Sequence, residues 1–142
     1  MIKEIKWNRT IAPIKIVLAD TYRDKRLCGN LMKRHLPPER RGEVDEVLKR
    51  AVILKMVLAW NFKETIKRRN PNFGFLVFEF SFEKPIVHFV YVSLNYRGRG
   101  IAKSLLEYAL IEPPFFYTFQ TNKKIRGATY KPQLLTKPWL NV

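Results

Sequence analysis

The chain has 142 residues, of which 46% are hydrophobic and 13% aromatic, which is typical of one globular domain and not of a disordered chain. Lysine and arginine number 27 against 12 acidic residues, and the resulting net charge of +15 indicates an anionic partner such as nucleic acid, an acidic protein or an anionic cofactor. No apolar run approaches the roughly 20 residues of a membrane span, and the N-terminus lacks the apolar stretch of a secretory signal, so we expect a single domain over residues 1–142 and no membrane partner.

The first half of the chain predicts a β-branched strand, two helices, a second strand and a basic connection, in that order. Asp20 or Thr21 can cap the first helix, and the Pro37-Pro38 pair ends it because proline is excluded from a helix interior. The predicted ranges are 14–18 and 52–60 for the strands, 22–35 and 39–51 for the helices, and 61–72 for the connection.

The second half predicts a hairpin of two long strands, a helix, a short strand and a tail. Glu83-Lys84-Pro85 would form the hairpin turn, and Pro113-Pro114 would stop the helix. In the tail we expect a loop with at most one further short strand. The predicted ranges are 73–82 and 86–94 for the hairpin, 100–111 for the helix, 115–119 for the last strand and 121–142 for the tail.

A glycine-rich turn, Arg-Gly-Arg-Gly-Ile-Ala at residues 97–102, lies between the hairpin and this helix. Gly98 and Gly100 have no side chains to block close approach, so backbone N–H groups can converge on phosphate oxygens. The helix start favours negative charge, and three cations lie beside it, namely Arg97, Arg99 and Lys103. The turn therefore predicts a phosphate-binding site.

Two common phosphate-binding motifs do not fit this turn. A P-loop requires Gly-Lys-Ser/Thr after four intervening residues, and that ending is absent. A dinucleotide motif requires a third glycine and an acidic residue about twenty positions later, but Ala102 comes too early and the segment near Phe119 is neutral.

The turn resembles the Arg/Gln-x-x-Gly-x-Gly/Ala signature of the GNAT N-acetyltransferases. The preceding strand matches the family pattern at Val90 and Val92 and the aromatic Tyr96 follows, although Leu94 replaces the usual proline. The resemblance implies that the backbone of residues 90–92 binds the pantetheine arm of acetyl-CoA and that the turn binds its pyrophosphate. The cofactor-binding residues so implied are Val90, Tyr91, Val92, Arg97, Gly98, Arg99, Gly100, Ile101, Ala102 and Lys103.

The order of elements extends the resemblance over most of the chain. It implies an α+β GNAT fold, with a central mixed, mostly antiparallel sheet flanked by helices and a shortened C-terminal part. Residues 73–121 also resemble small acetyltransferase-like proteins of tailed phages, through Val-His-Phe-Val-Tyr-Val, Tyr117-Thr118 and a later Tyr130-Lys131-Pro132.

Acetyl transfer to an amine needs a base and an acid. His88 is the candidate base, because strand alternation predicts that it shares a face with Val90 and Val92; a hydrogen-bonded structural histidine is the equal alternative. Glu79 could act instead, but the polar face of a half-buried strand explains it better.

The candidate acids are Tyr117 and Tyr130, although both could be packing aromatics. The family commonly uses a tyrosine on a later helix that this sequence does not predict, which leaves catalytic competence open.

Cys28 is the only cysteine, so an internal disulfide is impossible and a reducing compartment such as the cytoplasm is expected, the host cytoplasm if the chain is viral. Its place in an amphipathic helix favours a buried structural thiol over a nucleophile. One cysteine and two histidines do not favour a zinc site, so we expect no metal.

Two functions remain from the sequence. The first is an N-acyltransferase that moves an acetyl group from acetyl-CoA to an unidentified amine. The alternative is an inactive GNAT-fold binding protein of phage origin, associated with nucleic acid or virion assembly, for which the basic segments 34–41 and 63–69 could hold a phosphate backbone.

Overall fold

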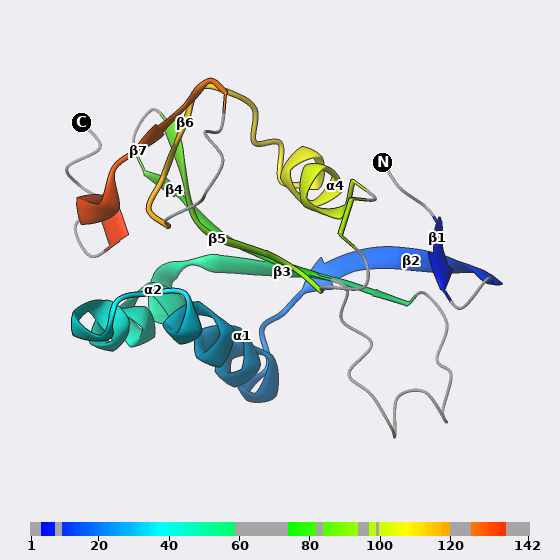
Figure 1. The fold of residues 1–142 in the computed structure, drawn as a ribbon, viewed down its shortest axis with the longest axis horizontal. Helices are drawn as coiled ribbons and strands as arrows, with labels where there is room; N and C mark the ends of the chain where they lie inside the picture. The colour runs from blue at the N-terminus through cyan, green and yellow to red at the C-terminus, as the bar shows by residue number, and fades with distance from the viewer. Residues whose placement is uncertain are drawn as a thin grey trace.

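The computed structural model describes residues 4–7, 10–58, 74–81, 84–93, 97–98, 100–119 and 126–135, with side chains described from residue 15 onward except those of Leu58 and Ser81. In this part of the chain, seven strands form one sheet in the order β1 to β7, and Figure 1 labels each of them. The strands are β1 (Glu4–Trp7), β2 (Thr10–Leu18), β3 (Val52–Leu58), β4 (Gly74–Ser81), β5 (Lys84–Val92), β6 (Phe115–Tyr117) and β7 (Ala128–Tyr130). The helices are α1 (Tyr22–Arg34), α2 (Val44–Arg50) and α4 (Ile101–Tyr108), with 3-10 turns at Pro38–Glu43 and Pro132–Leu135.

The sheet is mixed and mostly antiparallel. Strands β1 to β5 pair antiparallel with their neighbours in turn, whereas β6 joins β5 in parallel and β7 joins β6 in parallel. The prediction of an α+β chain with a mixed sheet flanked by helices is therefore confirmed.

Helices cover both faces of this sheet. Helices α1 and α2 lie on one face and α4 lies on the other (Figure 1). On the α4 side, Ile101 and Leu105 pack against Leu76 of β4. On the other side, Cys28 and Met32 of α1 belong to a second core with residues of β3, β4 and β5. β4 and β5 thus contribute to both cores, and other strands lie on either side of them in the sheet.

Thr21 is the residue that caps α1. Its backbone is extended and its Oγ1 accepts a hydrogen bond from the Asp24 N–H at 3.1 Å, which satisfies one of the free donors of the first turn. The helix ends at Arg34, ahead of Pro37 and Pro38 as predicted.

The predicted helix over residues 39–51 is two elements. A 3-10 turn covers Pro38–Glu43 and the α-helix proper begins at Val44. Gly42, a poor helix former, lies at the break, and Arg40 is turned to donate to the Glu43 carboxylate and to the Pro132 carbonyl.

Other boundaries also differ from expectation. β5 begins at Lys84, so Lys84 and Pro85 belong to the strand and not to a turn. The N-terminal strand β1 was not predicted, because four residues of alternating polarity are a weak signal. The one short tail strand that was allowed for is β7. The predicted connection at 61–72 and most of the tail lie outside the described residues.

Candidate functional site

The two ends of β5 have different neighbours. β4 pairs with β5 along its whole length, from Lys84 to Val92. β6 pairs with it only at Ile86 and Val87, after which a single further bond runs from the Thr118 N–H to the Val87 carbonyl at 3.1 Å. Beyond that point the described residues continue no ladder on this side, so β5 has an open edge toward residue 92.

The N-terminus of α4 lies beside this open edge. Gly100 precedes the helix with a left-handed φ of 78°, and its carbonyl accepts the first helical hydrogen bond from the Ser104 N–H at 2.9 Å. Gly98 has the same φ, so both glycines supply a conformation that other residues adopt at a cost. The N–H groups of the first turn have no acceptor within the helix and are available to an anion.

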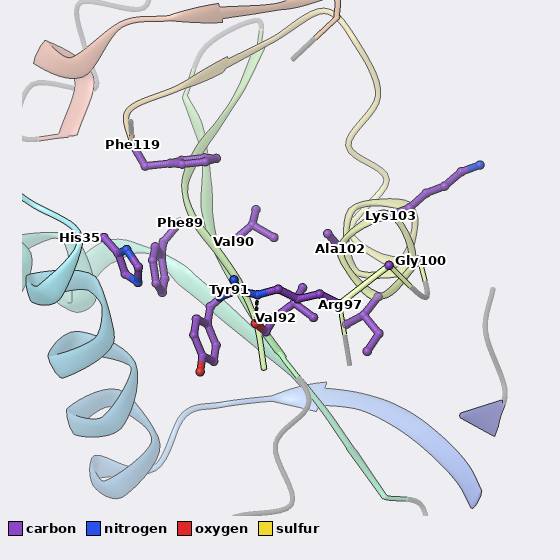
Figure 2. Close-up of a pocket in the computed structure, with 12 residues that line it drawn as sticks. His35, Phe89, Val90, Tyr91, Val92, Arg97, Gly100, Ala102, Lys103 and Phe119 are labelled. Atoms are coloured by element: carbon purple, nitrogen blue, oxygen red, sulfur yellow. Dashed lines mark hydrogen bonds between the residues drawn. The ribbon is translucent and has the colours of Figure 1, made fainter. Parts of the chain in front are cut away.

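Arg97 joins the glycine turn to the end of β5. Its Nε donates to the Val92 carbonyl at 3.0 Å, the bond drawn in Figure 2. The guanidinium keeps its positive charge beside β5, which suits a phosphate.

Gly74 permits the close packing of α4 on the sheet. A Cβ at this position would lie 2.6 Å from the Tyr91 carbonyl oxygen and 3.2 Å from Cγ2 of Ile101. The missing side chain therefore lets the helix N-terminus sit directly against β5.

A cavity of about 680 Å³ lies where the open edge meets the helix. All the predicted cofactor-binding residues that the structure describes line it, and Arg99 lies outside the described residues. The lining residues are His35, Phe89, Val90, Tyr91, Val92, Arg97, Gly98, Gly100, Ile101, Ala102, Lys103 and Phe119.

The lining comes from both sides of the sheet. Val90 packs with the α4 core, whereas Phe89 and Tyr91 pack with the α1 core. Figure 2 shows Phe119 above Val90, and Lys103 directed away from β5. With 81% of its side chain exposed, Lys103 adds charge at the rim and not inside.

His35, Phe89 and Phe119 belong to this cavity and were not predicted from sequence. His35 comes from the end of α1, and Phe119 follows β6. Both reach the site through tertiary packing, which no local pattern encodes. Phe89 lies inside the predicted strand, and its position next to Val90 was the available signal.

His88 lies at a β-bulge. Phe89 is paired with Val77 and Val87 with Phe78, so His88 is the extra residue opposite this step. Alternation is consequently interrupted: Val87, Val90 and Val92 share the α4 side, and Phe89 lies on the other. The expectation that His88 shares a face with Val90 and Val92 by simple alternation is therefore wrong.

His88 belongs to a buried polar network. The residue is only 1% exposed; its Nδ1 is hydrogen-bonded to Oγ1 of Thr118 at 2.9 Å, and its Nε2 lies 3.2 Å from Oε1 of Glu79. Glu79 is also buried and pairs with Nε of Arg50 at 2.9 Å, so it does not lie on an exposed polar face as expected. Arg50 also donates to the Leu135 carbonyl, which ties the C-terminal 3-10 turn to the network.

Burial and charge act in opposite directions on this network. Burial lowers the pKa of His88, although the Glu79 carboxylate opposes that shift. For Glu79, burial would raise the pKa, but the contacts with His88 and Arg50 outweigh it and the pKa is lowered. A neutral His88 beside an ionised Glu79 follows, and the Thr118 hydroxyl can then donate to Nδ1.

The two candidate acids lie together but do not line the cavity. Tyr117 and Tyr130 are opposite one another in β6 and β7, with ring centroids 5.4 Å apart. Tyr117 is buried and also contacts Phe119, at 5.5 Å between centroids, whereas Tyr130 is 39% exposed.

Cys28 is fully buried in the α1 core, where burial raises its pKa to about 12, which confirms the structural thiol. Among the described residues, no three His, Cys, Asp or Glu side chains are grouped to hold a metal. None of the described helices is long and apolar enough to cross a membrane.

Comparison with known proteins gives only distant similarities. No family model matches the sequence, and no curated protein matches it. The structure is similar to the ribosomal-protein-alanine N-acetyltransferase of Brucella melitensis biovar Abortus 2308, with 22% identity, a TM-score of 0.45 and coverage of 68% of each chain. It is also similar to a chain of the NatC complex bound to Gag peptide and CoA, with 20% identity and a TM-score of 0.45, covering 68% of this chain and 64% of that one, less than two thirds.

A third similar structure is an aminoglycoside N-acetyltransferase in complex with CoA, with 13% identity and a TM-score of 0.46, covering 92% of this chain and 85% of that one. Similarities with TM-scores below 0.5 and identities below 25% do not assign an activity to this chain.

Proposed function

We propose that this chain binds acyl-CoA and transfers its acyl group to an amine. The observation that carries the proposal is the cavity between the open edge of β5 and the N-terminus of α4, with two left-handed glycines and Arg97 at its opening. This combination of an extended free edge and a cationic helix start suits a ligand that has amides at one end and a pyrophosphate at the other.

Each part of CoA has a complementary surface in the cavity. The pyrophosphate fits the N–H groups of the first turn of α4, with Arg97 beside them. The pantetheine amides fit the edge of β5 near Val90 that no described strand covers, as an added strand would. The acyl end would then lie toward Phe89 and Phe119, where the lining is aromatic.

The reaction follows from the chemistry of the thioester. The amine nitrogen attacks the carbonyl carbon, a C–N bond forms, the C–S bond breaks, and one proton passes from nitrogen to sulfur in total. His88, Tyr117 and Tyr130 are the proton-transfer groups predicted from sequence, and they do not line the cavity. The proposal therefore rests on the binding geometry and not on these three side chains.

Calorimetric titration with acetyl-CoA tests the proposal. Gly100→Asp should abolish detectable binding, because aspartate adds strain at φ 78° and places a negative charge at the pyrophosphate. The matched control is Gly42→Asp, an exposed position at which a Cβ meets nothing within 4 Å, and its affinity should equal that of the wild type. Unchanged affinity in Gly100→Asp would falsify the site assignment.

A second candidate function is polyanion binding, favoured by a separate groove between α1 and α2. This groove has a volume of about 570 Å³, and its lining includes Lys25, Arg26, Lys33 and Lys49 against a single acid, Asp45. Tyr22 stands at the same groove with 81% of its surface exposed, available to stack on a base. This is the described surface that best fits the nucleic-acid alternative.

Fluorescence anisotropy with a labelled single strand and a duplex, at two salt concentrations, tests this candidate. Lys25→Glu combined with Lys49→Glu should weaken binding and reduce the salt dependence by about one unit of slope for each phosphate that the protein no longer neutralises. Gly100→Asp should not change it, since the two cavities share no lining residue. No retention of either nucleic acid at low salt would exclude this function.

A further inference from the structure

His35 closes the end of the cavity that lies away from the glycine turn. It follows the last residue of α1, and its backbone N–H bonds the Met32 carbonyl at 3.0 Å, which fixes it at the helix end. Its ring lies against that of Phe89, with centroids 5.8 Å apart. Figure 2 shows His35 and Phe89 together, across β5 from Ala102 and Lys103.

His35 and Phe89 line the cavity at some distance along β5 from the phosphate end. Phe89 precedes Val92 by three residues, which corresponds to about 10 Å of extended chain. Val92 carries the bond to Arg97 at the phosphate end. A ligand that enters at the turn and runs along β5 therefore passes Phe89 and His35.

The two histidines of the chain differ in availability. His88 is buried with Nδ1 bonded to Thr118 and Nε2 against Glu79. His35 is exposed, and within the described part of the chain neither of its ring nitrogens has a hydrogen-bond partner. An imidazole with a free nitrogen in contact with a ligand cavity can accept a proton from that ligand.

We propose that His35, and not His88, is the catalytic residue that accepts the proton of the attacking amine, an inference that rests on the proposed acyl transfer. The neutral amine attacks the thioester carbonyl, the new C–N bond forms as the C–S bond breaks, and the nitrogen's proton moves to the His35 imidazole. The imidazolium then returns that proton to the departing thiolate, so the products are an amide and free CoA thiol.

His88 then has a different role, as part of the network that joins β5 to β6 just before the strands separate. Substitutions of the two histidines should therefore affect different quantities, the reaction rate for His35 and the unfolding free energy for His88. His35→Ala should affect the rate, whereas His88→Gln should affect stability.

The test measures thiol release from acetyl-CoA with spermidine, an aminoglycoside and a peptide with a free α-amine, and also with no amine present. His35→Ala should bind acetyl-CoA within about threefold of the wild type and release thiol at least ~100-fold more slowly. Imidazole added to the buffer should restore part of the rate of His35→Ala and leave the wild type unchanged. Glu112→Ala, an exposed residue outside the cavity lining, is the control and should keep the wild-type rate.

The outcomes separate the inference from the proposed function. Wild-type rate in His35→Ala, or a reduced rate that only follows a reduced cofactor affinity, overturns the role of His35. Wild-type protein that binds acetyl-CoA but releases no thiol above the uncatalysed rate with any probe also overturns it, and leaves cofactor binding intact. Absence of acetyl-CoA binding in the wild type overturns both.

Discussion

The two ends of β5 have opposite characters although they belong to one strand. At the end near Val87, β4 and β6 flank the strand and His88 is enclosed by Glu79, Arg50 and Thr118. At the end near Val92, no described strand flanks the other side of β5, and a cavity lies there. At the closed end the Glu79 carboxylate and His88 Nδ1 have hydrogen-bond partners in the protein, whereas the open end has backbone groups that a ligand could bind.

This difference separates stability from function along nine residues. Buried polar groups without partners are costly, so a network such as that around His88 holds the fold in one arrangement. An edge with unpaired backbone groups gives up some of that stability and gains a binding surface. Substitutions at the closed end should therefore change stability, and those at the open end should change affinity.

The largest expected effect is at the closed end. Glu79→Ala leaves Arg50 and His88 without their carboxylate, and we expect a decrease of about 3 kcal/mol in the unfolding free energy, at the low end for a buried pair because Arg50 is partly exposed. Denaturant unfolding measures it. Glu46→Ala, which removes an exposed contact with Lys49, is the control and should cost less than about 0.5 kcal/mol. An equal decrease in unfolding free energy for Glu79→Ala and Glu46→Ala would contradict the claim that the buried ion pair stabilises the fold more than the surface ion pair.

Gly74→Ala should have the next largest effect, and it should act on both properties. The new Cβ would lie 2.6 Å from the Tyr91 backbone oxygen, so β4 must move away from β5 and α4, at a cost of about 2 kcal/mol and with weaker acetyl-CoA binding. Gly29→Ala is the matched control, because its Cβ would meet the movable Cδ1 of Leu48, at 2.8 Å. We expect that control to be close to wild type in thermal unfolding and in calorimetric titration.

Acid should weaken the closed end before the rest of the fold. The pKa of His88 is lowered in the folded state, so the unfolded chain binds the proton first and stability falls as the pH drops below about 6.5. Glu79, whose pKa is also lowered, adds a further destabilisation once the pH falls below about 4.5 and toward its folded value. We expect the unfolding free energy, measured with urea, to decrease between pH 7 and pH 5, and to depend less on pH in His88→Gln. The same slope in both proteins would contradict the assignment to His88.

The smallest effects concern the exposed cations of the open end. Arg97→Gln should weaken acetyl-CoA binding about fivefold, since it removes a charge and the bond to the Val92 carbonyl, with little change in stability. Lys103→Ala should cost about twofold, because its side chain points to solvent and pairs with Glu107 only at 4.0 Å. Titration at low and high salt gives both values, and a larger effect at Lys103 than at Arg97 would reverse the order of the two contacts.

The sequence predicted the elements and the contiguous part of the site, because strand, glycine turn and helix follow one another from Val90 to Lys103. It predicted the face of His88 wrongly, since a bulge is one extra residue that a period-two pattern does not reveal. It did not reveal His35, which reaches the cavity from α1, more than fifty positions before Phe89 in the chain. Periodicity in the sequence predicts local secondary structure, whereas contacts between segments distant in the chain are seen only in the structure.

The bulge at His88 also decides how β5 tolerates changes of length during evolution. Val87 and Phe89 already pair with Phe78 and Val77, which are consecutive in β4, so deletion of His88 alone would join the two halves of the strand into a regular ladder. Every other side chain of β5 would keep its face, and only the buried polar network would be dismantled. An insertion beside the bulge cannot be accommodated in the same way. One more residue would turn the aromatic rings beyond it to the α4 side of the sheet and the valines to the α1 side. Natural variants that lack one residue here should therefore be found more readily than variants that gain one.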